Sequence, residues 1–341
     1  MDRSGRIFVC VGIATGIVGV LASRNGWVWS RKRRGAQQVS VIGEIACNVI
    51  VNGVGEIPEW GETEVVAEPV AIVPGGPAVN MAVWLGSLTS DIIVTIPNVG
   101  GTDFCNVSQK MEQTRLVQPH SGTSCVGQTV ILTNEEDGKA IVRFGPEGVH
   151  VDNYSLNALV PNGTRLVHIA TSGVYVDFVH ACRKKQNVGF ISLAHVYNVE
   201  KSLAIIPLVD FFVCNQVEAI SLFPESVDLI DAILRISALC RCVVVTLGAD
   251  GALLMRKCVD LRPLRILCKD VLDCPLVDTV GVGDAFASGL VQQIVTRNLT
   301  PEAPGLVDAV RFACACGTAA CTVLGGSTFP GLGKIRECMI D

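Results

Sequence analysis

In DTVGVGDAF, residues 278–286, two closely spaced glycines precede a carboxylate at the start of an apolar segment. Glycine allows positive φ angles, so several backbone N–H groups can turn toward one point, and a helix N-terminus adds about half a positive charge there. Phosphate fits such a nest. Asp284 would repel bound phosphate unless it orients, or takes a proton from, a hydroxyl that attacks the phosphorus. The stretch therefore predicts phosphoryl transfer. In isolation, a plain strand-to-helix turn with Asp284 stabilising the helix dipole explains the same residues.

A second glycine pair precedes another apolar segment in PGGPAVNMAV, residues 74–83. Gly75 and Gly76 let a ligand approach the backbone closely. Asn80 offers both a donor and an acceptor, which suits a polyol.

The two motifs together resemble the signatures of the ribokinase-like (PfkB) carbohydrate kinase family, GG-x-x-x-N followed later by DT-x-G-x-GD-x-F. The resemblance extends over about residues 39–335. It implies an α/β fold, namely a three-layer sandwich with a central, mostly parallel sheet and a small β lid. It also implies a phosphotransferase with an alcohol group as acceptor, in which ATP and Mg²⁺ serve to phosphorylate a hydroxyl on a small sugar.

In this family pattern Asp284 is the catalytic base. The backbone amides of Gly281, Val282 and Gly283 would hold the charge that grows on the transferring phosphoryl group. Phosphoryl transfer depends mostly on positioning and on charge stabilisation, which is what such a nest supplies.

The resemblance also assigns a nucleotide site and two cation positions. The nucleotide-binding residues are Asn215, Thr246, Gly248 and Gly251, from an N-x-x-E element and a T-x-G-x-x-G loop. Glu218 would lie near Mg²⁺, through water, because Mg²⁺ keeps several waters and needs only one or two carboxylates. Asp278 and Val280 would hold K⁺, as in some relatives. Taken alone, Glu218 is also explained as a solvated glutamate in the first turn of a helix, and the loop as a hairpin turn.

Substrate binding is assigned to Asn48, Gly75, Gly76, Asn80 and Glu147. Two of these depart from the family pattern: Asn48 stands where most members have an aspartate that binds two sugar hydroxyls, and Glu147 stands where ribokinase-type members have asparagine. An amide both donates and accepts, and it is a weaker acceptor than a carboxylate. The predicted substrate is a sugar, with a nucleoside, as in adenosine kinases, as the alternative.

Outside the motifs, β-rich runs alternate with helical ones, which is the pattern of a parallel sheet covered on both faces. Strands are predicted near residues 39–51, 91–96, 166–170, 188–193, 209–214 and 242–247, and helices near 77–88, 102–113, 174–186, 227–240, 283–297 and 305–324. Alternating segments at 62–73, 127–133 and 139–144 predict lid strands. The kinase domain is thus expected over 39–341, with its lid near 51–73 and 127–144, and the motifs are expected to meet at the carboxyl ends of the strands.

Residues 1–38 are predicted to be a separate leader. Residues 7–22 form an uncharged apolar run, which basic residues flank on both sides, most densely at 31–34. The run is short for a spanning helix, which needs about 17–25 residues, unless the segment through Trp29 counts. Two interpretations remain open: a signal anchor whose basic flank keeps the kinase body in the cytoplasm, or a cleaved leader directed to an organelle.

Charge and cysteine content restrict the partners and the compartment. The net charge is −5, but residues 1–34 hold seven basic groups and one acid, which leaves 20 basic against 31 acidic residues, or −11, for the rest of the chain. An acidic body is a poor nucleic-acid binder, so none is expected as a partner. The 15 cysteines include no C-x-x-C pair, which disfavours zinc and favours small core residues in a reducing compartment.

Two classes of function stay open. The first is an active carbohydrate kinase that dimerises through its lid, as relatives do, with Trp60 of the P-x-x-GET segment at 57–63 as a contact. The second is a kinase-like, membrane-tethered binder of sugars or nucleotides with little catalysis, which Asn48 and the leader motivate. The intact Asp284 and glycine nest favour the enzyme.

Overall fold

The computed structural model describes residues 19–23, 26–30, 36–56, 63, 65–66, 69–98, 113–120, 127–133, 139–144, 151–170, 175–185, 188–196, 198–267 and 276–339. The chain divides into two compact units, Met1–Ala36 and Gln37–Asp341. The predicted helix near 102–113, except for its last residue, lies outside the described residues, as do Glu147 and Trp60.

The first unit contains a short antiparallel pair, β1 (Gly19–Ser23) and β2 (Gly26–Ser30), in which Gly19 lies opposite Ser30. A spanning segment counted through Trp29 would need a helix at these positions, where the structure has strands. None of the helices in the described part of the chain has the length and apolar character needed to cross a bilayer.

Within its described residues the second unit is built on a nine-stranded sheet of order β15-β14-β13-β12-β11-β10-β3-β6-β7. The strands are β3 (Gln37–Ile42), β6 (Ile92–Pro97), β7 (Thr114–Val117), β10 (Thr164–Ile169), β11 (Phe190–Ala194), β12 (Phe211–Asn215), β13 (Cys242–Thr246), β14 (Ala252–Arg256) and β15 (Leu264–Ile266). The strands from β13 to β7 are parallel, and β14 and β15 run antiparallel at one edge. The inner strands are buried apolar runs, as expected of a sheet with helices on both faces.

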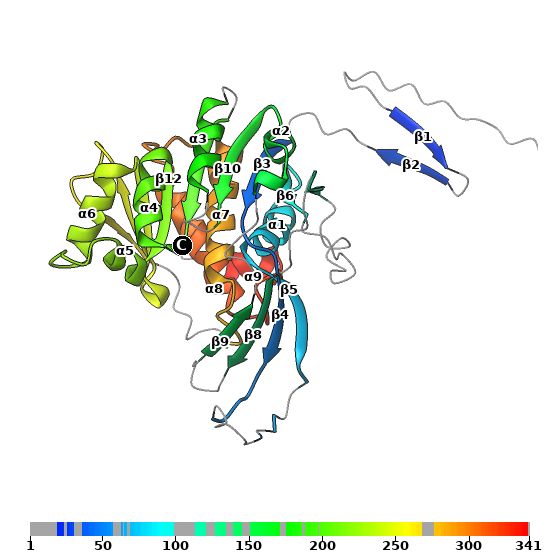
Figure 1. The fold of residues 1–341 in the computed structure, drawn as a ribbon, viewed down its shortest axis with the longest axis horizontal. Coiled ribbons are helices and arrows are strands. Elements are labelled where there is room, and N and C mark those ends of the chain that lie inside the picture. Colours follow the sequence, from blue (N-terminus) through cyan, green and yellow to red (C-terminus); the bar gives the residue numbers. More distant parts are fainter. Residues whose placement is uncertain are drawn as a thin grey trace, which may run out of the picture. The chain divides into compact units, whose positions relative to one another are not determined.

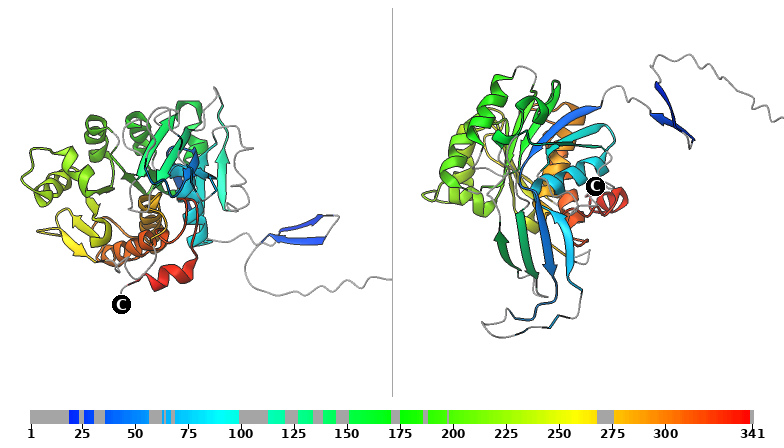
Figure 2. Two further views of the ribbon diagram at one scale, coloured as in Figure 1. Left: turned by 90° about the horizontal axis from the view of Figure 1, so that it is seen from below. Right: turned by 45° about the vertical axis from the view of Figure 1, so that its right-hand side comes forward.

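Helices flank the sheet in two groups (Figures 1 and 2). One group packs in the series α1 (Pro77–Leu88), α7 (Val282–Arg297) and α8 (Leu306–Ala320), and α9 (Leu332–Glu337) lies against α8. The other is the series α3 (Val176–Lys184), α4 (Val199–Ile205), α5 (Gln216–Leu222) and α6 (Leu229–Leu239). A single-turn helix, α2 (Leu156–Leu159), contacts β6. The three-layer α/β sandwich with a mostly parallel sheet is therefore confirmed.

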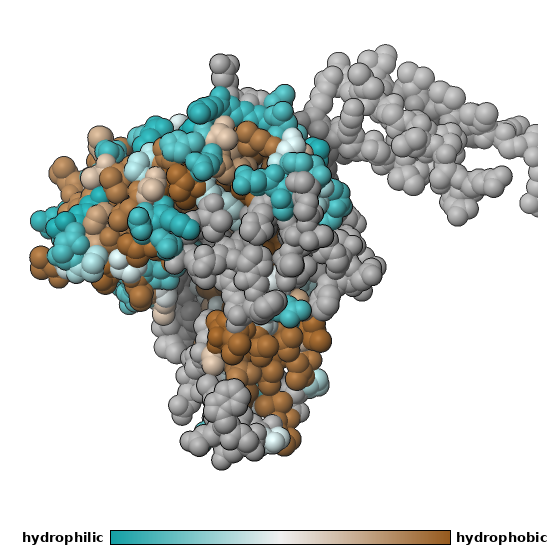
Figure 3. All heavy atoms as spheres, viewed as in Figure 1, coloured by the Kyte–Doolittle hydropathy of each residue, from teal (hydrophilic) through white to brown (hydrophobic). Residues whose placement is uncertain are grey.

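A second sheet forms the lid, with the order β5-β4-β8-β9. Its strands are β4 (Ala46–Val51), β5 (Ala71–Gly75), β8 (Gly127–Thr133) and β9 (Lys139–Phe144). They extend as one ribbon away from the helices, and apolar side chains gather over them (Figures 1 and 3).

The lid corrects one sequence-based expectation. A single strand was predicted over 39–51, but residues 43–45 separate β3 in the main sheet from β4 in the lid. The chain bends there because the Glu44 carbonyl oxygen accepts a hydrogen bond from the Ala78 amide (3.1 Å) at the start of α1. A Cβ at Gly76 would lie only 2.5 Å from that carbonyl oxygen, so the close approach requires glycine.

The cysteines behave as core residues. Within the described residues ten cysteines are free, and only Cys258 among them is exposed. Burial raises the pKa of the Cys182 and Cys240 thiols to about 12, which keeps them protonated and unreactive.

Trp84 anchors the inner side of α1. Its side chain is fully buried, and its indole Nε1 donates to the Gly326 carbonyl oxygen (3.0 Å). The indole also meets the Phe329 ring edge-on, with 5.1 Å between the ring centroids. This contact holds the loop around Gly326 against α1.

We expect Trp84→Phe to lower the free energy of unfolding by about 1–3 kcal/mol, because the Gly326 carbonyl loses its buried donor. Trp84→Ala should cost about 3–5 kcal/mol, because it also leaves a cavity. Urea unfolding of both variants measures the difference, and an unchanged midpoint for Trp84→Phe would show that the hydrogen bond contributes nothing.

Candidate active site

Asp284 lies in the first turn of α7, with 7% of its surface exposed. The helix starts after Gly281, which adopts the left-handed region with φ 76° and caps it without a side-chain hydrogen bond. The first amides of a helix have no partner within it, so those of Val282 and Gly283 can receive an anion. The glycine turn and the helix start that were predicted from the sequence are thus present, and the helix has 16 residues.

Asn80 and Asp284 are joined directly. The Asn80 Nδ2 donates to the Asp284 Oδ2 at 2.7 Å, although 204 residues separate the two. Asn80 is only 3% exposed, and within the described residues its Oδ1 has no hydrogen-bond partner. A buried carbonyl oxygen seldom lacks a donor, and a ligand hydroxyl could supply one here.

Two glycines, Gly281 and Gly326, allow the start of α7 and the loop beside Asn80 to approach each other closely. A Cβ on Gly281 would lie 2.3 Å from the Gly326 Cα, and a Cβ on Gly326 would lie 2.6 Å from the Asn80 Nδ2. The backbone of the nest therefore packs directly on the loop that Trp84 holds.

Asp278 also links the segment before α7 to the loop around Gly325. Its Oδ1 accepts from the Val280 amide and its Oδ2 from the Gly325 amide, both at 2.8 Å. The side chain is buried, so both carboxylate oxygens are used to fasten the nest to the segment after α8.

Asn48 and the first glycine motif lie together in the lid sheet, near the start of α1. Asn48 is buried in β4, and a Cβ built on Gly75 would lie 2.1 Å from the Asn48 Nδ2. Gly75 ends β5 and leads through Gly76 into α1, the helix that carries Asn80. Asn48 and Gly75 are thus close neighbours, and Asn80 lies in the first turn of the helix that follows Gly76.

Three of the four predicted nucleotide residues border a cavity of about 430 Å³, whereas Asn215 is not part of its lining. Thr246 ends β13, and Gly248 (φ 63°) and Gly251 (φ 87°) form the tight connection to β14. The cavity reaches Gly283 of the nest. Its lining consists of Thr246, Gly248, Ala249, Gly251, Leu276, Thr279, Val282, Gly283, Phe286, Cys314, Gly317, Thr318 and Cys321.

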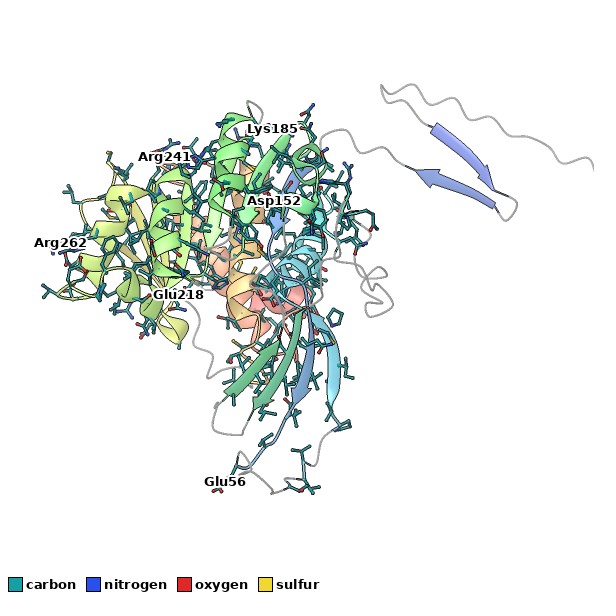
Figure 4. The ribbon with its side chains drawn as sticks, in the orientation of Figure 1. Glu56, Asp152, Lys185, Glu218, Arg241 and Arg262 are labelled. Atoms are coloured by element: carbon teal, nitrogen blue, oxygen red, sulfur yellow. The ribbon has the colours of Figure 1, made fainter. Side chains whose placement is uncertain are left out.

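Asn215 and Glu218 form a capping box at the start of α5. The Asn215 Oδ1 accepts from the Glu218 amide, and the Asn215 amide donates to the Glu218 Oε2, each at 2.8 Å. One oxygen of Glu218 is therefore engaged in the cap, while Oε1 faces His195. Figure 4 shows Glu218 at the end of the body from which the lid extends, whereas Lys185 and Arg241 lie at the opposite end.

His195 was missed by sequence reasoning. It follows β11, in the stretch SLAHVYN, where no glycine or acidic pattern marks it. Its position just past the carboxyl end of a predicted strand was the one available signal. In the structure its Nε2 lies 3.6 Å from the Asp284 Oδ1, and its Nδ1 lies 3.7 Å from the Glu218 Oε1.

Two histidines differ in charge because their surroundings differ. Burial alone lowers the pKa of His195, but Asp284 and Glu218 outweigh that effect and raise the pKa to about 10. Burial, reinforced by His195, lowers the pKa of His168 to about 3, so His168 is neutral. The His168 Nδ1 shares a 2.6 Å hydrogen bond with the Ser192 Oγ in the sheet below.

Most of the site residues predicted from the sequence therefore lie at or just after the carboxyl ends of β12 and β13, or around the starts of α1 and α7. A buried acid at the start of a helix, an adjacent cavity and a second, lid-like sheet are the features of an α/β enzyme that transfers a phosphoryl group to a small molecule.

Comparison with known proteins supplies the family. Residues 36–330 match the family model described as pfkB family carbohydrate kinase. The chain is 26% identical over 270 residues to a ribokinase of Lactococcus lactis, which covers 75% of this chain and 85% of the relative. The chain belongs to the pfkB family of carbohydrate kinases and is a ribokinase-like phosphotransferase with an alcohol group as acceptor.

Solved structures have the same fold. A ribokinase of Giardia lamblia superposes with a TM-score of 0.70 at 18% identity, covering 89% of this chain and 98% of the other. A nucleoside kinase of Methanocaldococcus jannaschii superposes with a TM-score of 0.64 at 19% identity, covering 89% and 97%. Sugar kinases and nucleoside kinases thus share this architecture.

We expect Gly281→Ala to lower both stability and activity. Alanine in the left-handed region costs about 1–2 kcal/mol, and its Cβ would in addition displace the Gly326 backbone. Urea unfolding and steady-state kinetics measure the two effects. The matched control is Gly86→Ala inside α1, whose Cβ meets nothing within 4 Å and which should be neutral or stabilising by about 1 kcal/mol.

Proposed function

We propose that this protein uses ATP to phosphorylate a hydroxyl group of a small sugar, with Asp284 as the catalytic base. The observation that carries this assignment is the 2.7 Å hydrogen bond from Asn80 to Asp284 at the start of α7. It ties the proposed sugar-binding motif to the proposed base, and the unpartnered Asn80 Oδ1 provides an acceptor for a sugar hydroxyl.

The chemistry follows from the positions of these groups. A hydroxyl held by Asn48 and Asn80 would lie within reach of Asp284, which takes its proton as the new O–P bond forms. The amides of Gly281, Val282 and Gly283 would stabilise the charge that develops on the transferring group. Thr246, Gly248 and Gly251 border a cavity that is large enough for a nucleotide, and ATP bound there would supply the phosphoryl group.

The cations are assigned on the same basis. Glu218 fits an Mg²⁺ site reached through water, because its Oε1 is free of the α5 cap and faces the His195 Nδ1. Both Asp278 carboxylate oxygens accept backbone amides, so K⁺ would depend on the backbone carbonyl oxygens of Asp278 and Val280. Replacing K⁺ with Na⁺ salts in the assay below tests that second cation.

The substrate assay separates the alternatives. ADP release by the full-length protein is measured with pentoses, hexoses, sugar acids and nucleosides. Turnover with a sugar supports the proposal, and preferential turnover with a nucleoside supports the nucleoside kinase alternative. Saturable binding of sugar or ATP without turnover would support the catalytically weak binder.

We expect Asp284→Asn to lower kcat by at least about 10²-fold, as is typical of a lost general base, while the KM for the sugar changes little. The amide keeps the shape of the side chain but cannot take a proton. Steady-state kinetics of the variant, with thermal unfolding to show that it folds, measures this effect. Turnover close to that of the unmodified protein would remove Asp284 from the mechanism.

The lid supports a further proposal, a homodimer. Cross-strand pairing aligns Ile72, Val49, Val130 and Val142 in one apolar row with one residue from each lid strand. Ile72 and Val142 are 64% and 66% exposed, which favours burial against the lid of a second copy.

We expect Val142→Lys to shift such a dimer toward monomers, because a charge would interrupt the apolar row. Sedimentation equilibrium over a range of concentrations measures this. The control is Val227→Lys, at a position that is 93% exposed outside the lid and should leave association unchanged. A monomeric unmodified protein at all concentrations would exclude the dimer.

We also propose that the kinase body lies in a reducing compartment and that residues 1–38 anchor or target the protein. The free cysteines in the described part of the chain support a reducing compartment for the kinase body. Anchoring to a membrane or targeting to an organelle rests on the sequence of residues 1–38 alone, and fractionation of cells that express the tagged full-length chain tests it.

A further inference from the structure

His195 is held in an unusual backbone conformation. Its φ angle is 59°, in the left-handed region that is uncommon for residues other than glycine, although asparagine, aspartate and histidine adopt it more often than the rest. Its amide donates to the Val213 carbonyl oxygen (3.2 Å), which continues the pairing of β11 with β12 past the end of β11. Such conformations persist where the surrounding structure enforces them, and they cluster at functional sites.

The imidazole ring lies directly over the nest. A Cβ on Gly283 would approach the His195 Cε1 to 2.7 Å, so the ring occupies the space that a side chain at this position would fill. Because Gly283 has no side chain, the imidazole ring can lie against its backbone, beside the amides that are proposed to bind a ligand. About a third of the His195 side chain remains exposed, on the approach to the site.

Both ring nitrogens face carboxylates that have another partner. The Asp284 Oδ2 accepts from Asn80, and the Glu218 Oε2 accepts from the Asn215 amide. The remaining oxygens, Asp284 Oδ1 and Glu218 Oε1, lie 3.6 and 3.7 Å from the ring nitrogens, which is too long for good hydrogen bonds. The ring therefore lies between the two acids. A ring N–H could donate to an acceptor that lies closer than either carboxylate.

Within the described residues, His195 is the side chain that forms ion pairs with Asp284 and Glu218. The lining of the cavity contains neither lysine nor arginine. Transfer of a phosphoryl group requires donors aimed at the oxygens on which charge develops. The helix amides are one such set, and the His195 ring lies beside them as a side-chain donor.

We propose that His195 is a second catalytic residue of the phosphoryl transfer, whose ring donates an N–H hydrogen bond to an oxygen of the transferring phosphoryl group. This rests on the proposed kinase function. In the step, the sugar oxygen gives its proton to Asp284 and forms the bond to phosphorus. The bond from phosphorus to the leaving oxygen breaks, and its electron pair stays on ADP. His195 supplies a hydrogen bond and gives up no proton.

The test compares substitutions at this position in the full-length protein. His195→Leu removes every donor and should lower kcat by about 10²–10³-fold, the usual loss for one such donor, with KM values for ATP and sugar within about threefold. His195→Gln restores one N–H donor at the end of a flexible chain and should recover part of that loss. The matched control is His180→Gln on the exposed side of α3, which should leave kcat unchanged.

A purely structural role is separated by two further measurements. His195→Asn suits the left-handed backbone but is too short to reach the ring position, so it should unfold near the temperature of the unmodified protein and still lose kcat. Binding of ADP with aluminium fluoride and sugar, which imitates the transferring group, should weaken in proportion to kcat, whereas binding of ADP alone should not.

The outcomes that overturn the proposal are distinct. If His195→Leu and His195→Asn fold and keep kcat within about threefold, His195 has no part in the chemistry. If the loss appears only in KM, or only in proportion to lost stability, the role is binding or folding. If the unmodified protein turns over no sugar or nucleoside at all, the proposed function fails, and this inference fails with it.

Discussion

The hydrogen bond between Asn80 and Asp284 is the contact on which the site depends. It joins the first turns of α1 and α7, which belong to motifs 204 residues apart, and it does so in a buried position where an unpaired amide or carboxylate would be costly. The glycines at 281 and 326 allow the backbones to approach closely enough for it, and Trp84 holds the second of them in place. The asparagine proposed to bind the sugar and the proposed base are thereby in contact.

A second constraint is the concentration of negative charge. Asp278, Asp284 and Glu218 all lie around a place that is proposed to receive phosphates. Asp278 accepts hydrogen bonds from two backbone amides, whereas the other two acids face His195. Helix-start amides and one imidazole thus balance the acids in the described part of the site, where many phosphate sites use lysine or arginine.

The fold and the main motifs could be predicted because they depend on local patterns. Alternating apolar runs and helices specify a parallel sheet, and glycine pairs beside Asn80 and Asp284 indicate turns that admit a ligand. The break between β3 and β4 could not be predicted, because it depends on a hydrogen bond from Ala78 in a distant helix start. His195 could not be predicted as a site residue, because only its contacts with Asp284 and Glu218, in two other elements, place it at the site.

The sequence by itself determined the class of fold, the nest at residues 281–283, the acid beside it and the departure at Asn48, because each of these is a property of neighbouring residues. The tertiary structure decided which groups meet. It set Asn80 against Asp284, used one oxygen of Glu218 to cap α5, and placed a strained histidine over Gly283. These arrangements depend on the packing of strand ends that are far apart along the chain, and no local pattern specifies them.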